Sequence, residues 1–285
     1  MRSLIEALEQ RVLLTDGAAA RRLRSEDLSL KRDLFGAEDL LAVLNLTRPG
    51  LVRRTHEAYL EAGADVIRTN TLGASPLSLA ERGFADEAFY LNHAAAEIAA
   101  AAVDNLPGKG RRRFVLGVVR DDGWDVAPAE IEASVAVQVE GLLSGGVDGI
   151  TLDILPGAGR TPVFLRGARR AKESLGARAP IFLQRGPAGA DFSDLAKGRA
   201  DGVIRYRHGP VERERLLAHA IEAEGVNLVG GGDLPTDTAR LDGQLRHLAE
   251  DGFRPFLPEA RPPALDDAVV PSSIRATALE AALAD

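Results

Sequence analysis

The chain has 285 residues, 45% of them hydrophobic, with a formal net charge of −7 and no cysteine. This length suits one complete α/β barrel of about 250 residues rather than two linked domains. The acidic balance argues against nucleic acid as a partner, no run reaches the roughly 18 apolar residues of a membrane helix, and the missing cysteines exclude disulfides and thiolate metal ligands. We therefore expect one cytoplasmic domain over residues 1–285, without a signal peptide.

Short β-branched segments alternate with longer helical ones along most of the chain, which predicts parallel strands joined by helices. Seven strands are expected at residues 12–15, 65–70, 114–119, 149–154, 180–184, 202–206 and 226–229. Residues 253–257 are the candidate for an eighth, although Pro255 removes a ladder donor there. These segments predict an α/β fold of the (β/α)8 TIM-barrel class, with an irregular or shortened region around the seventh and eighth strands.

The predicted helices lie between these strands and form an outer ring around the sheet. They cover residues 49–62, 86–103, 128–144, 160–175, 212–224 and 236–250. Gly63 is a normal helix stop signal, and Asp86 is expected to cap the second helix. Residues 17–48 form a long first βα loop, which such a barrel places at its catalytic face. A Pro- and Ala-rich tail covers residues 258–285, with a short helix expected at 272–284.

Several basic residues receive a structural interpretation. The run at residues 111–113, three arginines, is short and precedes a strand, so we expect a solvated loop there. His56 and His93 lie on predicted helices and are expected to be structural. No lysine ends a predicted strand, which argues against a Schiff-base aldolase on this barrel.

The segment from Thr55 to Thr71, THEAYLEAGADVIRTNT, is the most specific motif in the chain. It resembles the helix and second strand of the homocysteine S-methyltransferases, a family that includes betaine-dependent enzymes and the first module of cobalamin-dependent methionine synthase. TDGA at residues 15–18 resembles the family's opening strand end, and the segment from Gly145 to Asp153 is similar to a strand that ends in an acidic substrate ligand. The resemblance extends over about residues 10–155.

This chain departs from the family where the family binds its metal. The resemblance implies three cysteine thiolates that hold zinc, one after the sixth strand and two after a glycine pair. The corresponding places here are Arg205 or Tyr206, and Gly232 with Asp233. Zinc lowers the pKa of the homocysteine thiol and holds the sulfur as thiolate, and neither arginine nor glycine binds it. We therefore expect no metal site, and no cofactor held by the chain.

The carboxyl ends of the predicted strands converge on one mouth. The resemblance assigns Asp16 and Asp153 to the amino group of an amino-acid substrate, whereas an acid at a strand end otherwise often caps a loop. Asn70 and Thr71 either form hydrogen bonds with that ligand or close the turn. His208 follows the sixth strand and is the candidate catalytic acid or base. The predicted substrate-binding set is Asp16, Gly17, Arg68, Asn70, Thr71, Arg120, Asp153, Arg205 and Asp233.

Arginines are frequent at these strand ends. In one interpretation, their guanidinium groups form a bidentate pocket for a carboxylate or phosphate. In the other, they pair with Asp16, Asp153 and Asp233 and fill the space of the absent zinc site, in buried pairs that often stabilise little. Arg68 stands where the family has a glutamate, and we expect its side chain to face the space between Asp16 and Asp153.

The resemblance implies a divergent homocysteine S-methyltransferase that works without zinc on a small amino-acid-like or thiol substrate. Activation would come from His208 or from a partner protein that carries cobalamin or another methyl donor. The alternative is a non-catalytic relative that binds an anionic ligand or a protein partner through the barrel mouth. An unrelated barrel enzyme with an anionic substrate is a third hypothesis, and a homo-oligomer is compatible with all three.

Overall fold

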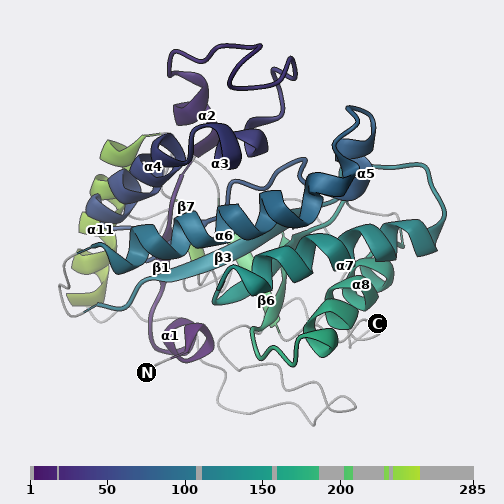
Figure 1. Ribbon diagram of the computed structural model, residues 1–285. Coiled ribbons are helices and arrows are strands. Elements are labelled where there is room, and N and C mark those ends of the chain that lie inside the picture. The colour runs from purple at the N-terminus through teal and green to yellow at the C-terminus, as the bar shows by residue number, and fades with distance from the viewer. Residues whose placement is uncertain are drawn as a thin grey trace, which may run out of the picture.

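The computed structural model describes residues 3–17, 19–106, 111–155, 159–185, 202–207, 228–230 and 234–250. Within these ranges, parallel strands form one curled sheet (Figure 1). The strands are β1 (Leu13–Thr15), β2 (Val66–Arg68), β3 (Phe114–Arg120), β4 (Gly149–Asp153), β5 (Ile181–Arg185), β6 (Gly202–Arg207) and β7 (Leu228–Gly230). They pair in chain order, and β7 pairs back to β1 with Leu228 opposite Leu13, so the described strands close into a barrel.

All seven predicted strands are present at the expected positions, although several are shorter than predicted. The predicted eighth strand at residues 253–257 lies outside the described residues. The parallel α/β class is therefore confirmed, and the eight-strand count stays a prediction.

Helices cover the outside of the sheet, and α6, α7 and α8 lie side by side (Figure 1). The long helices are α4 (Pro49–Glu61), α6 (Ala88–Asp104), α7 (Pro128–Ser144), α8 (Thr161–Ser174) and α11 (Pro235–Glu250). The predicted start at Asp86 is wrong, because residues 85–87 form a separate 3-10 turn, η2 (Ala85–Glu87), and no side chain caps α6. The predicted helices at 212–224 and 272–284 lie outside the described residues. Among the helices described, none is both long and apolar enough to cross a membrane.

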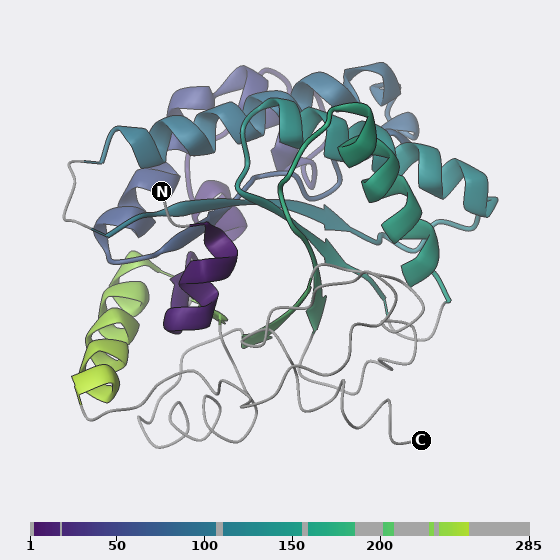
Figure 2. The same ribbon diagram turned by 90° about the horizontal axis from the view of Figure 1, so that it is seen from below.

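A short helix that the sequence analysis did not assign, α1 (Leu4–Gln10), lies across the amino-terminal end of the barrel (Figure 2). Its start is a capping box, in which Ser3 Oγ accepts from Glu6 N at 3.2 Å and Ser3 N donates to the Glu6 carboxylate at 2.7 Å. Leu4 and Leu8 pack against the inward-facing side chains of β1, β2, β3 and β5. The barrel interior is therefore closed from below by apolar side chains.

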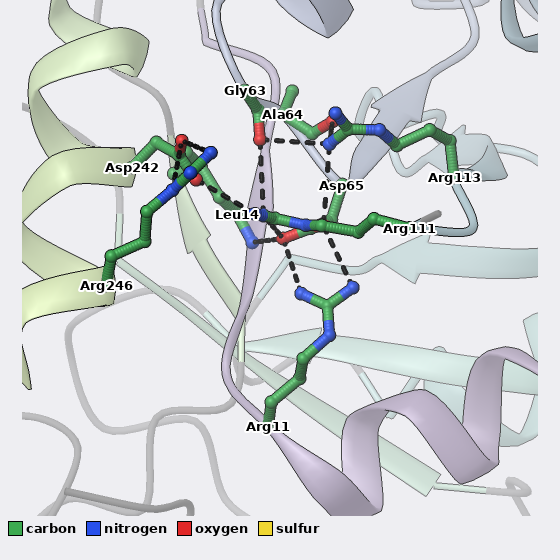
Figure 3. A network of polar contacts seen from close by, with 9 residues as sticks. All are labelled: Arg11, Leu14, Gly63, Ala64, Asp65, Arg111, Arg113, Asp242 and Arg246. Carbon is green, nitrogen blue, oxygen red and sulfur yellow. Dashed lines mark hydrogen bonds and ion pairs between the residues drawn. The ribbon is translucent and has the colours of Figure 1, made fainter. Parts of the chain in front are cut away.

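Ion pairs tie the amino ends of the strands together (Figure 3). Asp65, just before β2, is fully buried, and its carboxylate accepts from Arg11 Nη2 at 2.9 Å and from Leu14 N at 3.0 Å. Arg111 pairs with both oxygens of Asp65, and its Nη1 donates to Asp242 of α11 at 3.1 Å. The expectation of a solvated loop at residues 111–113 is therefore wrong for Arg111, because acids on two distant elements bind it.

The same network shifts the protonation equilibrium of Asp65. Burial pushes the pKa of Asp65 upward, but the hydrogen bonds and charges of Arg111 and Arg11 together outweigh it, and the net pKa lies below the ordinary value. Arg113 brings a third guanidinium to 3.5 Å from the carboxylate. Gly63 has φ +110°, and a Cβ there would lie 2.7 Å from the α11 carboxylate that joins the network, so a side chain at this position would push α11 away.

The first βα loop, residues 17–48, contains short helices of its own. They are α2 (Ala19–Arg24), the 3-10 turn η1 (Leu41–Val43) and α3 (Leu44–Thr47). Together with α5 (Pro76–Ala80), which follows β2, this segment builds a separate buried cluster that includes Leu23, Leu34 and Leu79. The carboxyl-terminal side of the sheet therefore carries a folded cap beside its mouth.

Candidate functional site

Asp16, Gly17 and Arg68 form one hydrogen-bonded unit where β1 and β2 end. Asp16 is 1% exposed, and its carboxylate accepts from the Arg68 backbone N at 3.1 Å and from Arg68 Nε at 3.0 Å. Thr15 Oγ1 donates to the same carboxylate at 3.0 Å, and Arg68 Nη2 donates to the Gly17 carbonyl at 3.0 Å. The charge of Asp16 is thus balanced by the guanidinium group of Arg68.

Asp153 ends β4 next to Arg120, its register partner at the end of β3. Its side chain is half-buried, and its carboxylate makes no hydrogen bond or ion pair with any residue that the structure describes. Burial raises the pKa of Asp153, while the positive charges of Arg120 and then Arg68 oppose that rise. The Arg68 guanidinium therefore contacts Asp16 and acts electrostatically on Asp153 across the mouth.

Asn70 and Thr71 support the turn after β2. Asn70 Nδ2 donates to the Leu41 carbonyl at 2.8 Å, and Asn45 Nδ2 donates to the Asn70 carbonyl at 2.8 Å. Thr71 is buried, and its Oγ1 donates to the Val118 carbonyl at 2.8 Å. Of the two roles considered for this pair, the contacts favour closure of the turn and attachment of the first βα loop.

Three of the predicted site residues are not placed with these groups. Arg205 lies on β6, in register with Arg185 of β5. His208 and Asp233 lie outside the described residues. Their roles stay predictions.

The negative charge of Asp16 acts on a buried histidine, His56, which the sequence analysis expected to be only structural. His56 of α4 is 1% exposed, and neither ring nitrogen has a hydrogen-bond partner among the described residues. Burial lowers the pKa of His56, and the negative charge of Asp16 only partly opposes this. His56 is therefore neutral at physiological pH. Its position on a predicted helix gave no signal of this, since the charge effect depends on where α4 lies relative to Asp16 in the folded chain.

A cavity of about 420 Å³ opens beside the mouth, between α2, α5 and the loop after β3. Asn70 and Arg120, both in the predicted set, lie on its wall together with Arg24, Arg82 and Trp124. The volume is in the range of small-molecule sites, about 300–1,000 Å³. The site thus has two parts, the acids at the strand ends and this cavity next to them.

The residues present do not fit the zinc site that the family resemblance implies. The whole chain has no cysteine, so it supplies none of the three thiolates. Within the described ranges, no group of three or more His, Asp or Glu side chains is placed to hold a metal ion. We derive no chemical step through zinc for this chain.

Comparison with known proteins assigns the family. The model of the homocysteine S-methyltransferase family matches residues 13–185, which include β1 to β5 and both strand-end acids. The chain therefore belongs to the homocysteine S-methyltransferase family, and the resemblance seen in the sequence is confirmed.

The relatives include longer proteins. Methionine synthase of Mycobacterium tuberculosis (strain ATCC 25618 / H37Rv) is 29% identical over 270 residues, which cover 92% of this chain and 21% of the relative. Methionine synthase of Mycobacterium leprae (strain TN) is 29% identical over 281 residues, again with 92% and 21% coverage. The chain thus spans about a fifth of the length of these curated relatives.

A solved structure supports the fold. The metallated form of the homocysteine methyltransferase MmuM from Escherichia coli superimposes with a TM-score of 0.63 at 20% sequence identity, over 83% of this chain and 97% of that chain. At this identity, the likeness concerns the fold alone.

Proposed function

We propose that this chain transfers a methyl group to the sulfur of homocysteine, or of a similar small thiol amino acid, at the carboxyl-terminal mouth of the barrel and without zinc. The family match over residues 13–185 carries the proposal, because it spans the strand ends that hold Asp16 and Asp153. The similarity to methionine synthases supports it. We also propose that residues 1–285 form one domain, with residues 258–285 as its tail.

The two strand-end acids are proposed to play different parts. The Asp16 carboxylate already accepts hydrogen bonds from Arg68 and Thr15, so few of its lone pairs are available to a ligand ammonium group. The Asp153 carboxylate has no such partner among the described residues. We therefore assign the substrate amino group to Asp153. An ammonium group bound there would lower the pKa of Asp153, because it adds a positive charge beside a half-buried carboxylate.

The transfer step needs a deprotonated sulfur. The thiol gives up its proton, the sulfur forms the new bond to the methyl carbon, and the donor leaves with the electrons of the bond that breaks. A thiol with a pKa near about 8.5 is only a few per cent thiolate at neutral pH, and this chain has no thiolate zinc site to help. We propose His208 as the proton acceptor and a separate cobalamin-carrying or methyl-donor protein as the methyl source.

A methyl-transfer assay tests the proposal. Chelator-treated protein is mixed with homocysteine and deuterium-labelled methyl donors, with and without a cobalamin-carrying protein, and labelled methionine is measured by mass spectrometry. We expect product in the presence of chelator, and we expect Asp153→Asn to lower kcat/KM about tenfold or more, since hydrogen bonds to charged groups are worth about 1.5–3 kcal/mol. Asp104→Asn, at the exposed end of α6, is the matched control and should change nothing. Absence of product with every donor, with ligand binding retained, would instead indicate a non-catalytic binding protein.

A further inference from the structure

The cavity beside the mouth contains cations whose hydrogen-bond donors its own acids do not satisfy. Arg82 is engaged at both terminal nitrogens, because its Nη2 donates to both oxygens of Asp39 at 2.9 and 3.0 Å and its Nη1 donates to the Ser78 carbonyl at 3.2 Å. Arg120 donates only its Nε, to Asp122 Oδ1 at 3.2 Å. Its two terminal nitrogens have no hydrogen-bond partner among the described residues.

Arg24 adds to this excess of donors. It ends α2, lines the same cavity, and makes no hydrogen bond or ion pair within the part of the chain that the structure describes. The acids of the wall are already used: Asp39 binds Arg82, and Asp122 also accepts from Ser78 Oγ at 2.7 Å. The remaining acid, Glu81, is 77% exposed.

A guanidinium group has five N–H donors and no acceptor, and its planar fork matches a carboxylate. The donors that stay open in the cavity therefore select a ligand group with several acceptor atoms and a negative charge. Arg120 lines the cavity and is also the register partner of Asp153, and its charge partly opposes the rise that burial causes in the pKa of Asp153. An anion bound at Arg120 would thus lie next to the proposed methyl-transfer site.

The rest of the wall is suited to hydrocarbon. Leu40, Leu41 and Leu72 line the cavity, and Leu72 is 37% exposed, so part of its side chain is accessible to a ligand. Trp124 lies on the same wall, with its Nε1 bonded to Ser78 Oγ at 3.2 Å, so the indole is held in place. Apolar and aromatic walls with a few placed polar groups are typical of small-molecule sites.

We propose that this cavity is a second ligand subsite, which binds the carboxylate of a small organic acid through Arg24 and Arg120 and its hydrocarbon part against Leu72 and Trp124. Binding here does not require methyl transfer. A chain that binds the acid but forms no methionine would disprove only the proposed function. A chain that forms methionine but does not bind the acid would disprove only the subsite.

Trp124 provides the measurement, because it is the only tryptophan in the chain. Its fluorescence is followed during titration with hexanoate at low ionic strength, where charge interactions are least screened. Acetate serves as the probe without a hydrocarbon chain, and 1-hexanol as the probe without charge. We expect a saturable change with hexanoate and affinities about tenfold or more weaker for both other probes.

Variants locate the effect. Arg24→Gln and Arg120→Gln should each raise the Kd for hexanoate about tenfold or more without lowering the thermal unfolding temperature, since both side chains are exposed. Arg166→Gln on α8, whose Nε pairs with Glu132 at 2.8 Å on the surface, is the matched control and should leave the Kd unchanged. An unchanged Kd in both cavity variants, or equal affinity for 1-hexanol and hexanoate, would overturn the proposal. So would the absence of any fluorescence change in folded wild-type protein.

Discussion

At the amino ends of the strands, Asp65 is fully buried and pairs with Arg11 and Arg111. Asp242 and the Gly63 carbonyl accept further hydrogen bonds from Arg111 (Figure 3). At the carboxyl ends, Asp16 is buried as well, but a single arginine, Arg68, balances it. The network at the amino ends joins residues in or next to five elements, whereas the pair at the mouth joins residues of two. The network around Asp65 joins α1, β1, β2, β3 and α11 into one scaffold, as expected for the amino-terminal face of a barrel, which serves stability.

The upper end differs because its charged groups are only partly matched. Asp153 has no partner among the described residues, and Arg24 and Arg120 present open donors to a cavity. At the carboxyl ends of barrel strands, charged groups without a protein partner are expected to pair with a bound ligand. The same residue types therefore stabilise the fold at one end and remain available for binding at the other.

Removing the Asp65 carboxylate from the network at the amino ends of the strands should have the largest effect on stability. Asp65→Asn keeps the shape of the side chain but removes the counter-charge of Arg11 and one of the two acids that pair with Arg111. Breaking a buried pair in this way costs about 3–5 kcal/mol. The free energy of unfolding from urea titration measures the loss. Glu132→Gln, which breaks the surface pair with Arg166, is the control and should cost no more than about 1 kcal/mol.

The pH dependence of that effect has a definite sign. The folded-state pKa of Asp65 lies below its unfolded value of about 3.9. Its contribution is therefore present above that pH and is lost as pH falls through the lower folded pKa. Wild-type and Asp65→Asn proteins should converge in stability only below about pH 4; a constant difference down to strongly acidic pH would contradict the assignment.

At the mouth, Arg68→Ala should cost about 3 kcal/mol, because it leaves the buried Asp16 carboxylate unpaired. The double variant Asp16→Asn with Arg68→Ala should recover part of this loss, as a double-mutant cycle would show. Unfolding free energies that add without coupling would mean that the pair is not formed in solution. Normal stability of Arg68→Ala combined with lost anion binding would instead make Arg68 a ligand anchor.

The smallest effect concerns His56. Its pKa is lowered in the folded state, chiefly by burial, so the unfolded chain takes up a proton near about pH 6.5 before the folded chain does. Stability should therefore fall as pH drops below about 6.5, by at most about 1 kcal/mol over the first pH unit. The His56→Gln variant should lack this fall in stability with decreasing pH. The His93→Gln variant, which replaces a partly exposed histidine of α6, should keep it.

The sequence predicted the strands well because β-branched runs of four to six residues mark them locally. It also located Asp16 and Asp153 through the motifs that end β1 and β4. It did not predict the burial of Arg111, since the partners Asp65 and Asp242 lie 46 and 131 residues away. The helix α1 was missed although Ser3 and Glu6 have capping-box spacing. The roles of Asn70 and Thr71 depended on where the loop at residues 17–48 packs, which no local pattern encodes.

The central claim is that this member of the homocysteine S-methyltransferase family works at its barrel mouth without zinc. Elemental analysis of protein purified from zinc-replete cells, combined with thermal unfolding before and after chelator treatment, tests it most directly. We predict far less than one zinc ion per chain and an unchanged unfolding temperature, because no cysteine is present to bind the metal. Stoichiometric zinc that a chelator removes with loss of structure would contradict the account.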